Sequence, residues 1–304
     1  MPSFQYKMVR TLFRTIGVNK MLDKEGEDFQ KLLDNYDKKQ KKLLKVPLKK
    51  LKPKFEIMKK DIAGTTCYVV RVRDSKPEKA VLYLFGGGYI LPPDPGDIVL
   101  CSEIAENCNV EVWFPLYPMA PGHKLTETLA SSLNVYRAIL NRFNPENIRF
   151  FGTSSGGGQA LSLCMFIKHE HSDAPFPKKL VLQSPGLQVP PSETQKKKMA
   201  ELKNRDVMIP PGFFDNIAPV LATGEDAYLL SPILDDLTGY PEIDIFYGTE
   251  EVMIAFLDDF KTACEKYGVR LNIHIGEGMM HCWGAMSFVP EAKAVRQEYF
   301  KALR

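Results

Sequence analysis

A serine between two glycines is the strongest chemical signal in this sequence of 304 residues. Residues 152–156 read Gly-Thr-Ser-Ser-Gly, which matches Gly-x-Ser-x-Gly, and they follow the apolar run 148–152. A nucleophile on a sharp strand-to-helix turn leaves no room for a Cβ two residues away, which explains both glycines. We therefore predict that Ser154 is a nucleophile. A phosphate-binding loop is disfavoured, because neither Gly-Lys-Ser/Thr nor Gly-x-Gly-x-x-Gly is present here.

A run of three glycines follows the apolar run 80–85, and it reads Phe-Gly-Gly-Gly-Tyr from Phe85 onward. Acyl transfer passes through a tetrahedral intermediate whose oxyanion needs backbone N–H donors. A loop without side chains lets the main chain approach that oxygen closely. We expect the amides of Gly87, Gly88 and Ser155 to form an oxyanion hole.

The general base must be one of five histidines: His123, His169, His171, His274 and His281. In an α/β sheet with a nucleophile at such a turn, the base comes last in the chain, on a loop after the final strand. Only His281 meets this condition, since it ends the loop 276–281 behind the apolar run 271–275. The others are expected to be structural: one precedes the serine, two end the helix after it, and one lies inside a strand.

The acid that orients the base should follow the preceding strand-like run, 243–247. Glu250 and Glu251 both stand there, directly after Gly248-Thr249. The spacing from the glycine favours Glu251 over Glu250, and the choice between them is left open. Asp258 and Asp259 lie on the following helical stretch, where we expect a solvated face.

Strand-like and helical stretches alternate from about residue 55 onward, as in a largely parallel α/β sheet. Ala63-Gly64 separates the first two strands and predicts a hairpin at a sheet edge. The other strands are apolar almost throughout, as expected for strands covered by helices on both faces. We expect strands at 55–62, 66–72, 80–85, 110–116, 148–152, 180–183, 243–247 and 271–275, and helices near 96–108, 124–143, 155–170, 250–267 and 289–303.

Two segments fall outside this alternation. Residues 1–50 are lysine-rich with helical spacing, and residues 186–230 are punctuated by prolines around a helix candidate at 193–206. We interpret both as parts of one cap over the carboxyl ends of the strands, where open α/β sheets bind ligands. The catalytic core is then 51–185 together with 231–304. The insertion contains the apolar residues Phe213, Phe214 and Ile217. We expect them either to line an apolar pocket or to form the internal packing of the cap, and this choice is left open.

The composition is that of an ordinary globular enzyme, with 44% hydrophobic and 25% charged residues. Residues 1–61 hold 17 Lys/Arg against 8 Asp/Glu, so the front of the chain is basic. Few aromatic residues interleave with these lysines, which argues against base stacking on single-stranded nucleic acid, and a solvated, mainly helical arm is the expected interpretation. The apolar runs are too short for stable membrane insertion, and the first 20 residues do not form a signal peptide. Six cysteines without a CxxC pair favour free thiols and a cytoplasmic location.

These motifs together resemble the hormone-sensitive-lipase-like family of esterases, including the arylacetamide-deacetylase type. The resemblance runs from about Lys79 to the end of the chain. It includes Tyr-Pro-Met-Ala-Pro-Gly-His at 117–123, Ser231-Pro232 and Gly-Met-Met-His at 278–281. It implies an α/β-hydrolase fold with a helical cap and supports Glu251 as the acid, on the family pattern Gly-x-x-Asp/Glu-x-Leu.

One position departs from the family pattern. The family's oxyanion motif is His-Gly-Gly-Gly, and this chain has Phe85 in place of the histidine. That histidine ties down the loop by hydrogen bonds, which a phenyl ring cannot make. Either packing holds the loop instead, or the protein is a weak enzyme or a binding relative.

The sequence thus predicts a serine hydrolase that cleaves short- to medium-chain carboxylic esters through an acyl-enzyme. Its triad would be Ser154, His281 and Glu251, and no metal or organic cofactor is implied. Three alternatives remain: an amidase or peptidase with the same triad, a receptor that binds its ligand without turnover, and a protein that uses the basic arm on a membrane surface. The expected partner is a small-molecule ester, with no nucleic acid. The choice between monomer and homodimer stays open.

Overall fold

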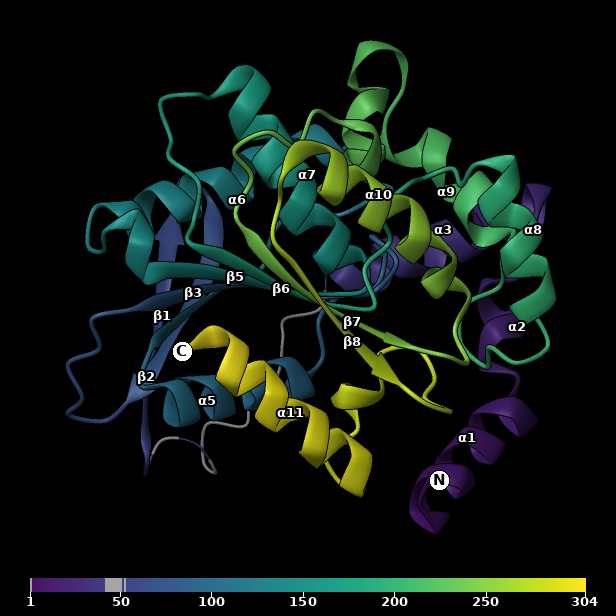
Figure 1. Cartoon of the computed structure of the whole chain (residues 1–304), viewed down its shortest axis with the longest axis horizontal. Helices are drawn as coiled ribbons and strands as arrows, with labels where there is room; N and C mark the ends of the chain where they lie inside the picture. Colours follow the sequence, from purple (N-terminus) through teal and green to yellow (C-terminus); the bar gives the residue numbers. More distant parts are fainter. Residues whose placement is uncertain (1, 42–50, 52) are drawn as a thin grey trace.

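An eight-stranded sheet runs through the centre of the protein, which we describe from a computed structural model covering residues 2–41, 51 and 53–304 (Figure 1). The spatial order of the strands is β1-β2-β4-β3-β5-β6-β7-β8. Pairing is antiparallel between β1 and β2 and between β2 and β4, and parallel elsewhere. The strands are β1 (Phe55–Ile62), β2 (Thr65–Val72), β3 (Ala80–Leu84), β4 (Glu111–Pro115), β5 (Ile148–Thr153), β6 (Lys179–Gln183), β7 (Glu242–Gly248) and β8 (Leu271–Gly276).

All eight predicted strands are present, and the predicted edge hairpin is confirmed. Ile62 pairs with Thr65 across the turn, where Ala63 and Gly64 both have positive φ, at 49° and 81°. Two successive positive φ angles give a turn whose twist matches that of the flanking strands. The strands β3, β4 and β6 are buried along nearly their whole length, as expected for a sheet covered on both faces.

Helices cover the two faces of the sheet (Figure 1). One layer contains α5 and α11, which contact each other, and the opposite layer contains α6, α7 and α10. The helices of these layers are α5 (Pro95–Cys108), α6 (Leu125–Leu140), α7 (Ser155–Glu170), α10 (Leu257–Tyr267) and α11 (Pro290–Leu303). Short 3₁₀ helices connect the elements: η1 (Pro145–Asn147), η2 (Gly224–Leu230), η3 (Pro232–Leu234), η4 (Val252–Phe256) and η5 (Trp283–Ala285).

One predicted helix, 250–267, is wrong at its start. Glu251 is extended, with φ −122° and ψ 146°, and only a 3₁₀ turn follows before α10 begins at Leu257. The backbone N–H of Val252 donates to Asp206 Oδ2 at 2.8 Å instead of entering an α-helix. The extended residue allows the Glu251 side chain to turn toward the sheet.

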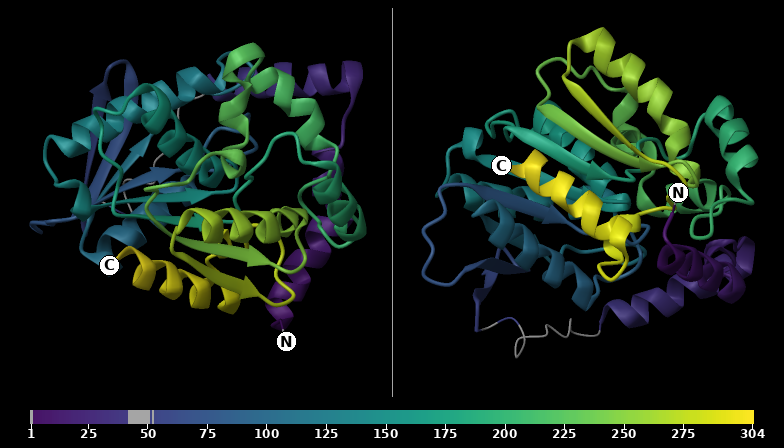
Figure 2. Two further views of the ribbon diagram at one scale, coloured as in Figure 1. Left: turned by 45° about the horizontal axis from the view of Figure 1, so that its top comes forward. Right: turned by 60° about the horizontal axis from the view of Figure 1, so that its bottom comes forward.

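The described parts of the two segments outside the alternation lie side by side beyond the carboxyl ends of the parallel strands (Figures 1 and 2). The rings of Phe29 and Phe213 meet edge to face at 6.3 Å, and Asn216 donates to the Lys24 carbonyl at 2.9 Å. Part of the predicted N-terminal cap segment, residues 42–50, lies outside the described residues. The elements are α1 (Phe4–Ile16), α2 (Val18–Leu22), α3 (Gly26–Gln40), α8 (Glu193–Leu202) and α9 (Phe213–Leu221).

Candidate active site

Ser154 occupies the turn between β5 and α7, with backbone angles φ 53° and ψ −124°. A positive φ at a non-glycine residue costs roughly 1–3 kcal/mol and persists only where the surroundings impose it. A Cβ on Gly152 would lie 2.5 Å from the carbonyl oxygen of Gly156, and a Cβ on Gly156 would overlap the carbonyl oxygen of Leu84. The spacing Gly-x-Ser-x-Gly therefore reflects close backbone contacts at a sharp turn, as predicted.

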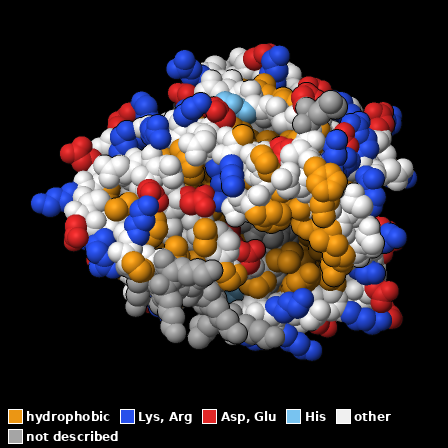
Figure 3. All heavy atoms as spheres, turned by 90° about the horizontal axis from the view of Figure 1, so that it is seen from below, with side chains coloured by type: hydrophobic (Ala, Val, Ile, Leu, Met, Phe, Trp, Pro, Cys, Tyr) orange, Lys and Arg blue, Asp and Glu red, His pale blue; other side chains and the backbone are white. Residues whose placement is uncertain are grey.

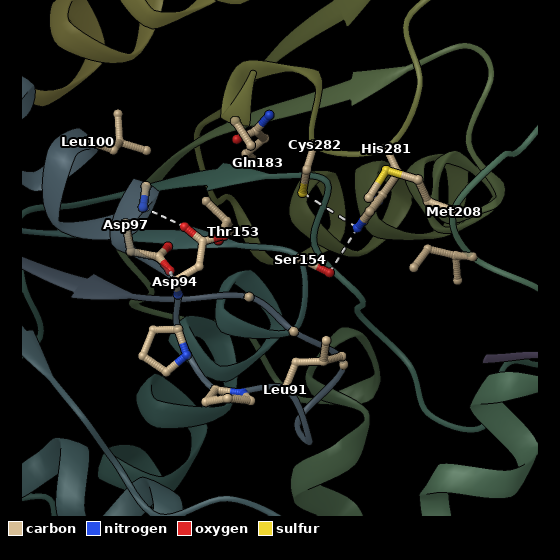
Figure 4. Close-up of a pocket in the computed structure, with 18 of the residues that line it drawn as sticks. Leu91, Asp94, Asp97, Leu100, Thr153, Ser154, Gln183, Met208, His281 and Cys282 are labelled. Carbon is tan, nitrogen blue, oxygen red and sulfur yellow. Dashed lines mark hydrogen bonds between the residues drawn. The ribbon is translucent and has the colours of Figure 1, made fainter. Parts of the chain in front are cut away.

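The structure brings Ser154, His281 and Glu251 into one hydrogen-bonded chain. The Ser154 Oγ lies 2.9 Å from His281 Nε2 (Figure 4), and His281 Nδ1 lies 2.6 Å from Glu251 Oε2. All three side chains are buried. A neutral imidazole with its proton on Nδ1 donates to the carboxylate and accepts from the serine hydroxyl, which is the arrangement needed to remove the serine proton.

The Glu251 carboxylate has two further donors on Oε1. The hydroxyl of Ser184 donates to it at 2.9 Å and the backbone N–H of Gly248 at 2.6 Å. The same Ser184 hydroxyl accepts the backbone N–H of Cys282 at 3.1 Å, so one serine links the acid to the histidine loop. Burial raises the pKa of Glu251, and the hydrogen bond from His281 opposes this rise. These donors hold the carboxylate in a single orientation toward the imidazole.

Glu250, the other acid left open by the sequence, is held elsewhere. Its carboxylate pairs with Arg10 at 2.6 Å and with Arg205, and these pairs lower the pKa of Glu250, the Arg205 hydrogen bond most. Glu250 therefore connects α1 to the segment before α9, and Glu251 is the acid that reaches His281.

The four remaining histidines lie away from Ser154. His169 contacts Asp235, His274 contacts Asp244 and His123 contacts Glu127, each at 2.8 Å. The ring of His171 packs against Phe166 at the end of α7. Each therefore has a structural partner, in agreement with the expectation from the sequence.

The triple-glycine loop lies beside Ser154. Gly87 and Gly88 have φ of 126° and 59°, and both line the same cavity as Ser154. Among the described residues, no acceptor is found for the backbone N–H of Gly87, Gly88 or Ser155. The Tyr89 N–H donates to the Ser155 hydroxyl at 3.3 Å and joins the loop to α7. Free amides near a serine hydroxyl could receive the oxygen of a tetrahedral intermediate.

Aromatic packing holds the loop at the position where the family pattern has histidine. The Phe85 ring stacks on Tyr117 with centroids 4.1 Å apart and planes at 4°, and it meets Phe114 edge to face at 5.9 Å. The Tyr117 hydroxyl also donates to the Phe85 carbonyl at 2.6 Å. Ring stacking and this hydrogen bond therefore stand where the family pattern has the hydrogen bonds of a histidine.

The surroundings of His281 shift the pKa of its imidazole in opposite directions. Burial alone would lower the pKa of its imidazole, but the Cys282 thiol and the Glu251 carboxylate outweigh burial and raise it. The Cys282 Sγ lies 3.5 Å from His281 Nε2, on the same side as Ser154 (Figure 4). An ionised Glu251 stabilises the imidazolium that forms when the serine attacks.

A cavity of about 370 Å³ opens onto Ser154. Its wall is largely apolar, with Val18 and Leu22 from α2 and Met208 and Ile209 from the segment before α9. Polar groups from Asp97 and Gln183 also reach it. Phe213, Phe214 and Ile217, which the sequence offered as pocket residues or as packing of the cap, do not line this cavity. They are buried in the packing around α9, where Phe214 contacts Phe256.

Three residues that support the site were not predicted from the sequence. The Tyr6 hydroxyl accepts the backbone N–H of Met280, directly before His281. Buried Asp206 accepts the N–H groups of Met208 and Ile209 at 2.8 and 3.0 Å, besides that of Val252. The third is Ser184, which directly follows β6 at the edge where functional residues of a parallel sheet gather, and this position could have indicated it.

Two features are absent from the part of the chain that the structure describes. Within residues 2–41, 51 and 53–304, no group of three or more His, Cys, Asp and Glu side chains is placed to hold a metal ion. In the same part of the chain, no helix has the length and hydropathy needed to cross a bilayer.

The fold and the arrangement around Ser154 define an α/β hydrolase. The chain belongs to the alpha/beta hydrolase fold family, whose profile matches residues 81–285. It is similar to an esterase of Acinetobacter venetianus, with 24% identity over 247 residues and 79% of each chain covered. An acetyl-hydrolase of Streptomyces hygroscopicus is 25% identical over 221 residues, which cover 71% of this chain and 72% of that protein.

Solved structures share the whole architecture. EstE5 soaked with p-nitrophenyl butyrate superimposes with a TM-score of 0.82 at 24% identity, covering 99% of this chain and 98% of that one. An esterase from the bacterial hormone-sensitive lipase family superimposes with a TM-score of 0.79 at 19% identity, covering 100% of this chain and 98% of that one. The predicted α/β-hydrolase fold class is confirmed, and the relatives named esterase and acetyl-hydrolase agree with the predicted relation to esterases.

Proposed function

We propose that the protein hydrolyses carboxylic esters of short to medium acyl chain length through an acyl-enzyme on Ser154. His281 acts as general base and later as general acid, and Glu251 orients its ring. The hydrogen-bonded chain from Ser154 Oγ through His281 to Glu251, at 2.9 and 2.6 Å, is the observation that carries this proposal. The names of the relatives support a carboxylic ester hydrolase.

In the proposed first half-reaction, His281 Nε2 takes the Ser154 proton while Oγ bonds to the ester carbonyl carbon. The carbonyl oxygen becomes an oxyanion, which the N–H groups of Gly87, Gly88 and Ser155 receive. The C–O bond to the alcohol then breaks, and the alcohol leaves with the proton from His281. In the second half-reaction, water replaces the alcohol and releases the acid.

The cavity and its cover support a small substrate. A volume of about 370 Å³ lies at the low end of typical ligand pockets, which span roughly 300–1,000 Å³. We infer that residues 1–50 and 186–230 form the cap, since Leu22 and Ile209 close the cavity from these two segments. The six free cysteines support a reducing compartment such as the cytoplasm.

The experiment is hydrolysis of p-nitrophenyl esters from acetate to decanoate by the wild-type protein and by Ser154→Ala. The matched control is Ser102→Ala, because Ser102 is also buried and its hydroxyl donates to the Ile98 carbonyl away from the cavity. We expect turnover to be abolished in Ser154→Ala and retained in the control. Equal rates for wild type and Ser154→Ala would refute the proposal.

Two further assays separate the alternatives that the sequence left open. A fluorophosphonate probe labels an activated serine, so a receptor without catalytic function would stay unlabelled. Side-by-side assays with p-nitrophenyl butyrate and the matching p-nitroanilide distinguish an esterase from an amidase. We expect labelling at Ser154 and faster cleavage of the ester.

A further inference from the structure

The first helix, α1, has two apolar faces, and among the described residues only one of them packs against the rest of the protein. Tyr6 and Gly17 are buried, and Val9 and Phe13 pack against the core. Arg10, on the same face, pairs with Glu250. These contacts fix the helix to the body of the enzyme, so the orientation of its other face is fixed as well.

The outward face of α1 carries four large apolar residues at a spacing of four. Their side chains are strongly exposed: Phe4 74%, Met8 57%, Leu12 54% and Ile16 58%. Residues four apart are neighbours on a helix, so the four form one continuous stripe. Single exposed apolar residues are common on enzymes, but a contiguous stripe of this kind marks an interaction surface. We call these four residues the α1 stripe.

The charged side chains of α1 itself are all cationic, and the acidic Glu291 of α11 accepts the hydroxyl of Ser3 at the start of the helix. Lys7 and Arg14 are exposed on α1, and neither forms an ion pair with any described residue. The helix itself contains no acidic residue, and the first one in the chain is Asp23. An exposed apolar stripe bordered by unpaired cations is typical of a helix that lies in the interface of an anionic bilayer.

The α1 stripe leads to the entrance of the cavity. The next helix, α2, begins directly after Gly17, and its residues Val18, Met21 and Leu22 line the cavity that contains Ser154. Met21 is itself 54% exposed and extends the apolar surface to that entrance. Seen from the side on which α1 lies in Figure 1, hydrophobic side chains gather around a hollow, with Lys and Arg side chains near it (Figure 3).

We propose that α1 docks the enzyme on an anionic lipid surface, with the α1 stripe in the headgroup boundary and Lys7 and Arg14 on the lipid phosphates. At 13 residues the helix is too short to span a bilayer, which takes about 20 residues, so it lies on the surface. Docking in this orientation turns the cavity entrance toward the lipid. Esters dissolved in the bilayer then reach Ser154 without crossing water, a consequence that rests on the proposed function.

The test is flotation of the full-length Ser154→Ala protein with vesicles, which measures binding independently of turnover. Vesicles of phosphatidylcholine alone are compared with vesicles containing phosphatidylglycerol. We expect binding to the anionic vesicles that weakens as NaCl rises from about 0.05 to 0.5 M, because salt screens the cations. Equal binding to both kinds of vesicle, or none to either, would overturn the inference.

Two variants locate the contact. Leu12→Glu places a charge in the middle of the α1 stripe and is expected to lower vesicle partition about tenfold or more. Its matched control is Leu234→Glu, since Leu234 is 69% exposed outside α1 and should leave partition unchanged. Lys7→Gln combined with Arg14→Gln should abolish the preference for anionic lipid. Unchanged partition of Leu12→Glu would contradict docking through the α1 stripe.

A second copy of the chain is the competing occupant of the α1 stripe. Light scattering after size exclusion decides between the two: a wild-type dimer that Leu12→Glu converts to a monomer would assign the stripe to self-association and overturn lipid docking. Hydrolysis of p-nitrophenyl butyrate in solution should be equal in wild type and Leu12→Glu, while hydrolysis of a long-chain ester carried in anionic vesicles should fall only in Leu12→Glu.

Discussion

The hydroxyl of Tyr6, in the first helix, accepts the backbone N–H of Met280, the residue before His281. These two residues are 274 positions apart in the chain. Burial, the largest influence, raises the pKa of Tyr6 to about 12, so the phenol stays neutral over the working pH range. The N-terminal helix therefore supports the loop that carries the proposed general base.

Replacing Tyr6 by phenylalanine should weaken catalysis through the position of His281. The change leaves the Met280 N–H without an acceptor, and an unsatisfied buried group costs about 1–3 kcal/mol. We expect kcat for p-nitrophenyl butyrate to fall about tenfold, with KM little changed. The control is Tyr240→Phe, which removes a 2.6 Å hydrogen bond to Asp235 away from the cavity and should leave kcat intact. Equal loss in both variants would indicate general destabilisation instead.

The pH profile should report the raised pKa of His281. Only the neutral imidazole can accept the Ser154 proton, so kcat/KM falls as the pH drops and His281 becomes protonated. Burial opposes protonation, but Cys282 and Glu251 outweigh it and raise the pKa of His281 above 6.5. We therefore expect the midpoint of the acidic limb of kcat/KM to lie above pH 6.5. Circular dichroism at each pH verifies that the protein stays folded. A midpoint below that value would contradict this electrostatic picture.

Glu251→Gln should lower kcat by about 10³- to 10⁴-fold, as expected when the group that orients the histidine loses its charge. The same change should move the acidic limb to lower pH, since the imidazolium loses its stabilising carboxylate. Glu250→Gln is the matched control: it breaks the pairs with Arg10 and Arg205 but leaves the His281 contact untouched. A larger effect at Glu250 than at Glu251 would reverse the assignment of the acid.

Phe85→Ala should destabilise the protein and weaken catalysis together. The side chain is 1% exposed and stacks on Tyr117, and removing a buried phenyl ring typically costs about 3–5 kcal/mol of unfolding free energy. The glycines that follow would lose their support, so we expect kcat to fall more than KM rises. Denaturant unfolding and steady-state kinetics measure the two effects. Phe288→Ala, at a side chain 66% exposed, should change stability by less than about 0.5 kcal/mol.

Local patterns in the chain were sufficient for the eight strands of the sheet and for the central serine, but not for the start of the helix after Glu251. The apolar strand, the Gly-x-Ser-x-Gly spacing and the helix after it all describe contacts among neighbouring residues, because Gly152 and Gly156 are needed only for the backbone around Ser154. The alternation of strands and helices likewise predicted the parallel sheet, since each strand needs its own cover. The order of serine, acid and base followed from chain order in such a sheet.

Tertiary packing decided the rest. Two adjacent glutamates look alike in sequence, and only the extended backbone at Glu251 sends that side chain to His281 while Glu250 turns to Arg10. The α1 stripe also needed the structure, because helical spacing shows that a face is apolar but not whether another element covers it. Contacts between segments far apart in the chain depend on how all the elements pack together, and a local sequence pattern does not predict this packing.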